Sequence, residues 1–297
     1  MTMGTTTQAY GEPWYWDNRY AHESGPFDWY QKYPSLAPLI KLYVPSHHQR
    51  ILIVGCGNSG TSLSLSSLTR AYLMYHQQRP FSEGMVDDGY EDVVNVDISS
   101  VVIEAMMKKY SNRPQLKYIK MDVRQMDEFQ TGSFDSVVDK GTLDSLLVSF
   151  CALYFIYVFY DKLLIPNIVT YGAPIYRLGM LRDSCSWNIK LHVIEKLVVE
   201  EKSGHPIWEL TNPVPLENDG RSVEELLGKN PDVHYIYVCT KKLHIMCVEK
   251  QGTCFRRLAT KPFSLVFPKA HFSPSCSLCF AWQVAIMLLQ CNWDEIM

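Results

Sequence analysis

Residues 51–59 read Ile-Leu-Ile-Val-Gly-Cys-Gly-Asn-Ser. Four apolar residues, three of them β-branched, come directly before Gly55 and Gly57. An unbroken apolar run of this kind is typical of a strand buried on both faces of a parallel sheet. Glycines after such a strand permit a tight turn and let backbone amides approach a ligand closely. The stretch therefore predicts the first strand and turn of a nucleotide-binding α/β domain.

A second apolar strand is predicted at residues 92–97, with Asp97 at its carboxyl end. In a doubly wound fold, an acidic residue about 20 positions beyond the glycine turn binds the ribose hydroxyls. Asp97 lies 40 positions after Gly57, and removing the 21 residues 60–80, which are rich in Ser and Leu, would leave 19. We interpret residues 60–80 as an insertion before a first helix that starts at Phe81. The alternative is that they lengthen this helix.

Two further strands are predicted, at residues 116–121 and within residues 133–140. After the first, the carboxylate of Asp122 can accept a hydrogen bond from an adenine amino group, and Val123 offers its backbone; an Asp there can also be only a turn former. The second strand runs into the polar elbow 139–144, at the edge where an open parallel sheet presents its reactive groups.

The helix predicted at residues 101–110 is amphipathic and begins after Ser99 or Ser100 as its cap. Its inward-facing side chains are expected to be Val102, Met106 and Met107. Further along the chain, residues 165–171 predict a fifth strand, and residues 188–195 and 233–240 an antiparallel strand pair.

Residues 14–33 carry eight aromatic rings. One interpretation is that they fasten a short helix, at about residues 15–22, onto the main sheet. The other is that some of them close over a flat or cationic ligand by stacking.

The composition is that of an ordinary globular protein, with 47% hydrophobic and 20% charged residues. A net charge of −3 argues against a sequence-independent nucleic-acid binder. Nine scattered cysteines indicate reduced thiols, and the polar amino terminus does not have the pattern of a signal peptide, so we expect a cytoplasmic protein. The apolar run 146–160 is shorter than a membrane span, which argues against a membrane protein.

Gly55, Gly57 and Gly60 formally spell a dinucleotide-binding fingerprint. A nicotinamide-dependent oxidoreductase is disfavoured because Gly60 is the first residue of the suspected insertion.

Six blocks of sequence occur in a fixed order: Tyr15–Tyr20, Phe27–Trp29, Val54–Ser59, Val96–Asp97, Met121–Val123 and Asp139–Asp144. Together they resemble the class I S-adenosylmethionine-dependent methyltransferases, in the methyltransferase-like group that includes elongation-factor lysine methyltransferases. The resemblance covers residues 10–147 apart from the insertion and resumes over roughly 170–242. It implies a Rossmann-like doubly wound α/β sheet, mostly parallel, with an antiparallel pair of strands near the carboxyl end.

The resemblance also implies S-adenosylmethionine as cofactor and assigns its contacts. The methionine end would be lined by Trp16, Tyr20 and Trp29, and the glycine turn of Gly55 and Gly57 would pass beneath it. Asp97 would bind the ribose, Asp122 and Val123 the adenine, and Lys140 would complete the pocket. Ile98 also belongs to this pocket, although some relatives carry an aromatic residue there.

By resemblance, the acceptor would be a lysine of a protein, such as a translation factor. Asp139 or Asp144 is a candidate to orient the amine. No metal is expected, since Cys276-Ser277-Leu278-Cys279 has no second pair at zinc spacing. The alternative is a catalytically inactive methyltransferase-like binding protein, motivated by the atypical segments 60–80 and 148–168 beside the expected cleft.

We therefore expect three parts of the chain. Residues 1–50 form an aromatic cap segment, residues 51–242 a methyltransferase domain, and residues 243–297 a tail to which the resemblance does not extend.

Overall fold

The computed structural model describes part of the chain. The described residues are 7–22, 30–58, 81–147, 166–170, 172–184, 187–196, 208–217, 221–241, 245–250 and 253–258. The chain divides into two compact units, Met1–Lys242 and Leu243–Met297. The suspected insertion 60–80, Trp29 and the Cys276–Cys279 motif lie outside the described residues.

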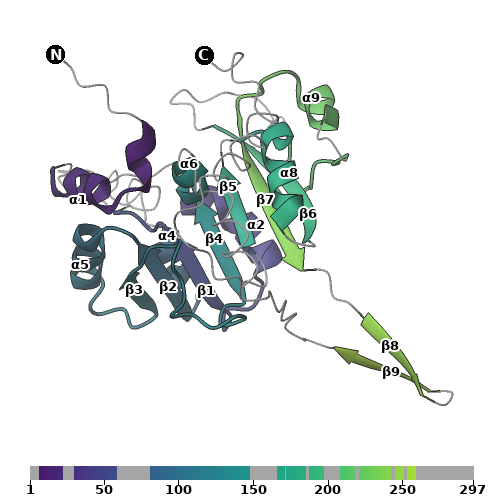
Figure 1. Ribbon diagram of the computed structural model, residues 1–297, viewed down its shortest axis with the longest axis horizontal. Coiled ribbons are helices and arrows are strands. Elements are labelled where there is room, and N and C mark those ends of the chain that lie inside the picture. The colour runs from purple at the N-terminus through teal and green to yellow at the C-terminus, as the bar shows by residue number, and fades with distance from the viewer. Residues whose placement is uncertain are drawn as a thin grey trace, which may run out of the picture. The chain divides into compact units, whose positions relative to one another are not determined.

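The first unit is built on a seven-stranded sheet with the strand order β3-β2-β1-β4-β5-β7-β6 (Figure 1). Its strands are β1 (Arg50–Val54), β2 (Asp92–Asp97), β3 (Leu116–Lys120), β4 (Ser136–Lys140), β5 (Pro166–Thr170), β6 (Trp187–Glu195) and β7 (Val233–Lys241). Neighbouring strands from β3 to β5 pair in parallel, whereas β7 pairs antiparallel with both β5 and β6. The prediction of a mostly parallel sheet finished by an antiparallel pair is confirmed.

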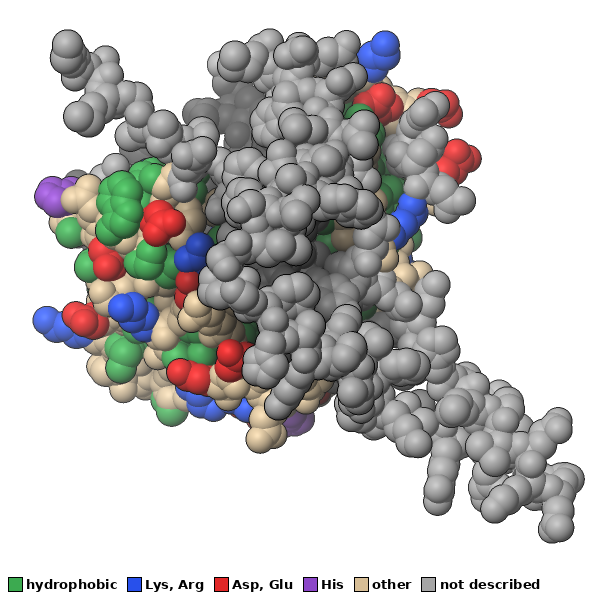
Figure 2. Space-filling view, viewed as in Figure 1, with side chains coloured by type: hydrophobic (Ala, Val, Ile, Leu, Met, Phe, Trp, Pro, Cys, Tyr) green, Lys and Arg blue, Asp and Glu red, His purple; other side chains and the backbone are tan. Residues whose placement is uncertain are grey.

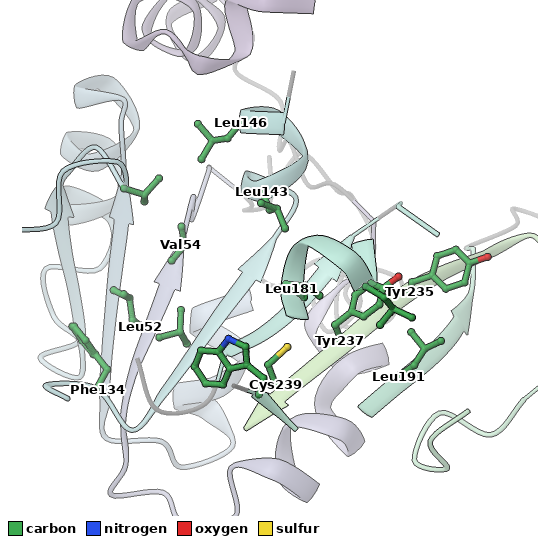
Figure 3. Close-up of a cluster of buried hydrophobic side chains, with 14 of the residues drawn as sticks. Leu52, Val54, Phe134, Leu143, Leu146, Leu181, Leu191, Tyr235, Tyr237 and Cys239 are labelled. Carbon is green, nitrogen blue, oxygen red and sulfur yellow. The ribbon is translucent and has the colours of Figure 1, made fainter. Parts of the chain in front are cut away.

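Strand β1 is buried because it lies near the middle of the sheet, between β2 and β4. Its side chains alternate between two hydrophobic clusters, with Leu52 and Val54 in one and Ile51 and Ile53 in the other. Figure 3 shows the first cluster, in which Leu52 and Val54 lie with Leu143 and Leu146, among others. The apolar run that predicted this strand therefore reflects burial on both faces.

Helices cover both faces of the sheet. The helices are η1 (Thr7–Gly11), α1 (Pro13–His22), α2 (Tyr33–Tyr43), α4 (Phe81–Asp87), α5 (Ser100–Lys109), α6 (Thr142–Leu147), α8 (Pro174–Ser184) and α9 (Arg221–Leu227). One cluster takes apolar side chains from α6, α8 and α9, and the other from α2, α4 and α5. This is the layered arrangement of a doubly wound fold.

Helix α5 corrects one detail of the prediction. Ser99 is its cap, and the Ser99 side chain accepts a hydrogen bond from the Val102 amide at 3.3 Å. Met107 is 54% exposed, so its predicted inward position is wrong, and Ile103 is buried instead. Val102, Ile103 and Met106 share one helix face, and Met107 lies about 100° further round the helix than Met106.

The second unit contains a two-stranded antiparallel hairpin of β8 (Ile245–Lys250) and β9 (Thr253–Leu258). None of the helices in the described ranges has the length and apolar character needed to cross a membrane.

Candidate functional site

A cleft opens at the carboxyl ends of β1, β2 and β4 in the first unit. After β3 the chain crosses to the other side of β1 to form β4, so the strand order reverses between β1 and β4. Ligands of open α/β sheets bind at such a switch point. The cleft holds about 900 Å³ of empty space, part of which is open solvent.

The glycine turn forms the floor of the cleft. Gly55 and Gly57 have φ values of 61° and 59°, in the left-handed region that glycine adopts without strain. A Cβ at Gly55 would overlap Thr142 Oγ1, which donates a hydrogen bond to the Val54 carbonyl at 3.1 Å. The turn thus brings bare backbone to the cleft and packs against the start of α6.

Asp97 is held beside this turn. Its Oδ2 accepts a hydrogen bond from the Gly57 amide at 3.0 Å, and its Oδ1 accepts one from the Ser99 amide at 3.0 Å. Burial raises the pKa of Asp97 to about 6, although the backbone amides of Ser99, Gly57 and Ile98 act in the opposite direction. The glycine bend and the acid at the end of β2 therefore meet.

An aromatic wall faces them from the amino-terminal segment. Trp16 and Tyr20 of α1 stack with ring centroids 5.8 Å apart, and both line the cleft. The Trp16 indole donates a hydrogen bond to the Tyr10 carbonyl at 2.8 Å, which brings η1 to the same wall. Tyr10 and Gly11 line the cleft as well. Stacking over a ligand and fastening of α1 are thus both consistent with the geometry.

The far end of the cleft is formed after β3. Asp122 and Val123 line it, and Ile98 lies there after β2. The Asp122 carboxylate accepts hydrogen bonds from Arg124 Nη2 at 2.7 Å and Arg124 Nε at 2.9 Å, so a charged partner already orients it. Lys140, at the end of β4, is a predicted cofactor residue that also lines the cleft.

Asp139 caps α6 from below the cleft. It is 1% exposed, and its oxygens accept hydrogen bonds from the amides of Thr142 at 3.0 Å and Leu143 at 3.1 and 3.2 Å. Burial raises the pKa of Asp139 to about 7, and the charge of Asp144 adds to the rise. Asp139 does not contribute to the cleft lining.

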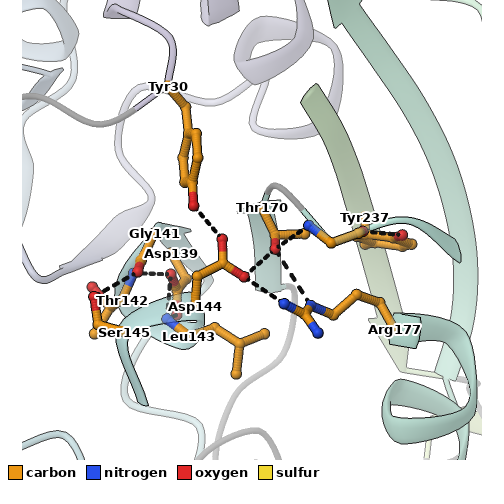
Figure 4. A network of polar contacts seen from close by, with 11 residues as sticks. Tyr30, Asp139, Gly141, Thr142, Leu143, Asp144, Ser145, Thr170, Arg177 and Tyr237 are labelled. Atoms are coloured by element: carbon orange, nitrogen blue, oxygen red, sulfur yellow. Dashed lines mark hydrogen bonds and ion pairs between the residues drawn. The ribbon is translucent and has the colours of Figure 1, made fainter. Parts of the chain in front are cut away.

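Asp144 is the centre of a polar network shown in Figure 4. Its Oδ2 accepts a hydrogen bond from the Tyr30 hydroxyl at 2.5 Å, and its Oδ1 pairs with Arg177 at 2.8 Å and accepts a bond from Thr170. Tyr30 has a φ of 68°, which is uncommon for a residue other than glycine. The network joins the amino-terminal segment to α6, β5 and α8, and Asp144 does not reach the cleft lining.

The structure thus brings together every predicted cofactor residue that it describes: Trp16, Tyr20, Gly55, Gly57, Asp97, Ile98, Asp122, Val123 and Lys140. Trp29 lies outside the described residues.

Other lining residues were not predicted: Tyr10, Gly11, Phe81, Gly141, Thr142, Ser145 and Leu146 are among them. Gly141 and Thr142 belong to a sequence block that was recognised, whereas nothing in the local pattern singles out Tyr10. Within the described ranges, no group of three or more His, Cys, Asp or Glu residues could hold a metal ion.

Comparisons with known proteins agree with this geometry. Residues 79–149 match the model of the "Methyltransferase domain" family. The "EEF1A lysine methyltransferase 4" of Mus musculus is 38% identical over 140 residues, which are 46% of this chain and 46% of the relative. The "eEF1A lysine and N-terminal methyltransferase" of Homo sapiens is 35% identical over 144 residues, which are 48% of this chain and 18% of the relative. The matched region thus spans less than half the length of these curated relatives.

Among solved structures, the [4+2]-cyclase SpnF aligns over 80% of this chain and 96% of that chain, with 13% identity and a TM-score of 0.48. This likeness is too low to support an argument, so the fold assignment rests on the strand order and the family match. The described core thus has the strand order of a doubly wound fold, residues 79–149 match the methyltransferase-domain family, and about half of the chain is similar to eEF1A lysine methyltransferases.

Proposed function

We propose that the protein transfers a methyl group from S-adenosylmethionine to a lysine side chain of another protein. The observation that carries the proposal is the meeting of the glycine turn, Asp97 and the aromatic wall of Trp16 and Tyr20 around one cleft. Within this proposal, residues 1–50 form the cap of a methyltransferase domain that spans residues 51–242.

The residues present fit this cofactor. The glycine turn leaves the backbone bare where a Cβ at Gly55 would fill space. Asp97 supplies a carboxylate to accept hydrogen bonds from ribose hydroxyls, and Asp122 one to accept a bond from the adenine amino group. Trp16 and Tyr20 offer ring faces, which attract a cationic sulfonium. When bound, the cofactor supplies an electrophilic methyl group.

The chain's own part in catalysis would be orientation and exclusion of water. A lysine must be neutral to attack, and burial against aromatic rings lowers the pKa of an amine because it disfavours the charged form. Tyr10, Trp16 and Tyr20 provide such a wall at one side of the cleft. Asp139 and Asp144 stay predicted orienting groups, and in the structure both carboxylates hold neighbouring elements in place.

We infer that the acceptor is a translation factor from the names of the relatives, and we therefore place the protein in the cytoplasm. A protein partner also agrees with the surface charges. Figure 2 shows Lys and Arg side chains interspersed with Asp and Glu over the described part of one face. A nucleic-acid binder would instead gather basic residues.

The proposal is tested by incubating the purified chain with methyl-labelled S-adenosylmethionine and eEF1A, followed by mass spectrometry of the acceptor. We expect a methyl group on a lysine with the wild-type chain and none with the Asp97→Ala variant. Equal labelling by the two proteins, or no labelling of any protein acceptor, would contradict the proposal.

A further inference from the structure

Asp17 lies on α1 between the two aromatic residues of the cleft wall, and its carboxylate reaches another helix. Its Oδ1 accepts hydrogen bonds from the Ser99 hydroxyl at 2.6 Å and the Val101 amide at 3.3 Å, and the Ser100 hydroxyl lies 3.4 Å from both of its oxygens. The first amides of a helix have no partner within the helix, and its amino terminus carries partial positive charge. Asp17 therefore caps α5 from outside that helix.

The same short segment also holds Asp97. The Ser99 amide donates to Asp97 Oδ1 at 3.0 Å, while the Ser99 hydroxyl donates to Asp17. Ser99 thus connects Asp97, the proposed ribose-binding acid, with α1. Because Trp16 and Tyr20 project from α1 into the cleft, the position of Asp17 sets how far the aromatic wall lies from Asp97.

We propose that Asp17 is a positioning residue of the cofactor site, which ties α1 to the amino terminus of α5 and so holds the aromatic wall against the strand end that carries Asp97. The inference rests on the proposed function, because S-adenosylmethionine is what the two walls would enclose. Asp17 lies outside the cleft lining, so its role is exerted through Ser99 and through its neighbours on α1.

The charge of Asp17 provides an additional signature. Burial acts to raise the pKa of Asp17, but hydrogen bonds from Ser99, Val101 and Ser100 outweigh it and lower the pKa, so this carboxylate stays ionised. Among the described residues, the Cys56 thiol of the glycine turn and the Asp17 carboxylate are titratable groups that interact with Asp97. The negative charge of Asp17 adds to the rise in the pKa of Asp97 that burial causes.

The test compares Asp17→Ala, Asp17→Asn and the control Asn18→Ala, whose side chain is exposed on the same helix. Calorimetric titration of the full chain with S-adenosylmethionine measures Kd. We expect Kd to rise at least about tenfold for Asp17→Ala, since hydrogen bonds to a charged group are lost. It should stay within about twofold for Asn18→Ala, as expected of a surface change. Hydrogen exchange of the amides in α1 should quicken only in the Asp17 variants.

The pH profile separates positioning from a general loss of stability. Ribose binding needs the Asp97 carboxylate, so affinity should fall as pH drops through the pKa of Asp97, over a titration from about pH 8 to about pH 5. Removing the charge in Asp17→Asn lowers the pKa of Asp97, so the midpoint of this fall should move to lower pH. A merely structural role would leave that midpoint unchanged.

The outcomes distinguish the two proposals. If folded wild-type chain shows no binding, the proposed function fails. If wild type binds and Asp17→Ala has the same Kd and the same α1 exchange rates, the positioning role of Asp17 is overturned while the proposed function stands. If the midpoint pH of the fall in affinity is the same in Asp17→Asn as in wild type, the charge of Asp17 does not influence Asp97.

Discussion

At the scale of single residues, Gly55 is a position of the site that tolerates a side chain poorly. A side chain there meets two separate penalties, a left-handed φ of 61° and an overlap with Thr142 Oγ1. Backbone strain of this kind costs about 1–2 kcal/mol, and the overlap adds to it. The glycine is therefore required both by conformation and by the close approach of α6.

We predict that Gly55→Ala lowers the free energy of unfolding by more than the strain alone, and that Thr142→Ala in the same chain restores part of the loss. The restoration is partial because the new Cβ would still lie 3.2 Å from the Thr142 Cβ. Chemical denaturation of the two single variants and the double variant measures this. If the two losses simply add, the contact between these residues is not the cause.

Asp139 gives a prediction about stability and pH. Its pKa is 3.8 in the unfolded chain and about 7 in the folded protein, mainly because of burial. A raised pKa means that the folded state binds the proton more tightly. The stabilising contribution is therefore full below the unfolded pKa and is lost as the pH rises through about 7.

Asp139→Asn removes this titration and keeps an oxygen that can cap α6. The free energy of unfolding of the variant, relative to wild type, should thus increase between pH 5 and pH 8 by at least about 1 kcal/mol, the equivalent of roughly one unit of pKa. Asp97 titrates in both proteins and cancels from the difference. A difference that is flat with pH would show that Asp139 does not carry a buried charge.

Sequence reasoning at this scale found residues whose role follows from their place after a strand. Asp97 and the glycines of the turn were found in this way. It did not find Asp17 or the anchoring role of Asp144, because both act through partners distant in the chain, Ser99 and Tyr30, which no local spacing encodes.

At the scale of helices and strands, the amino-terminal segment is fastened at two places. Asp17 joins α1 to α5, and Tyr30 joins the residues before α2 to Asp144 at the start of α6. Arg177 neutralises the Asp144 carboxylate, with both side chains less than a fifth exposed. The elbow after β4 thus serves as an anchor as well as a wall of the cleft.

We predict that Tyr30→Phe lowers the free energy of unfolding by about 1.5–3 kcal/mol, the usual worth of a hydrogen bond to a charged group. Tyr176→Phe is the matched control, because Tyr176 is 59% exposed on α8. Thermal unfolding followed by circular dichroism compares the two. Equal melting temperatures for the two variants would show that the Tyr30 hydroxyl does not contribute.

The strands were the most predictable elements. The predicted second strand agrees with β2 at both ends, and the first differs from β1 by one residue. Long apolar runs and their flanking turns are local signals, whereas the inward face of α5 required a choice between Met107 and Ile103 that depends on how the helix is rotated against the sheet.

At the scale of the whole molecule, the strand order was expected from the resemblance, and the pairing shows it directly. Whether residues 60–80 are an insertion is a separate question, namely whether the domain can fold and bind its cofactor without them. Gly57, which precedes this segment, and Phe81, which follows it, both line the cleft.

Deletion of residues 60–80 tests whether this segment is an insertion. If the segment is an insertion, the shortened protein should fold and bind S-adenosylmethionine with a Kd within about threefold of the full chain, since loop length affects stability only weakly. Calorimetry and thermal unfolding of the two proteins provide the comparison. A folded deletion variant without affinity would show that residues 60–80 contribute to the site.

The central claim, that three strand ends and an aromatic wall form one S-adenosylmethionine site, is tested most directly by calorimetric titration of the wild-type chain and of Asp97→Asn and Asp97→Ala. Glu104→Ala, an exposed carboxylate on α5, is the control. We predict micromolar binding by wild type and control, and its loss in both Asp97 variants without loss of the fold. Absence of heat with folded wild-type protein, or full affinity in the Asp97 variants, would contradict the account.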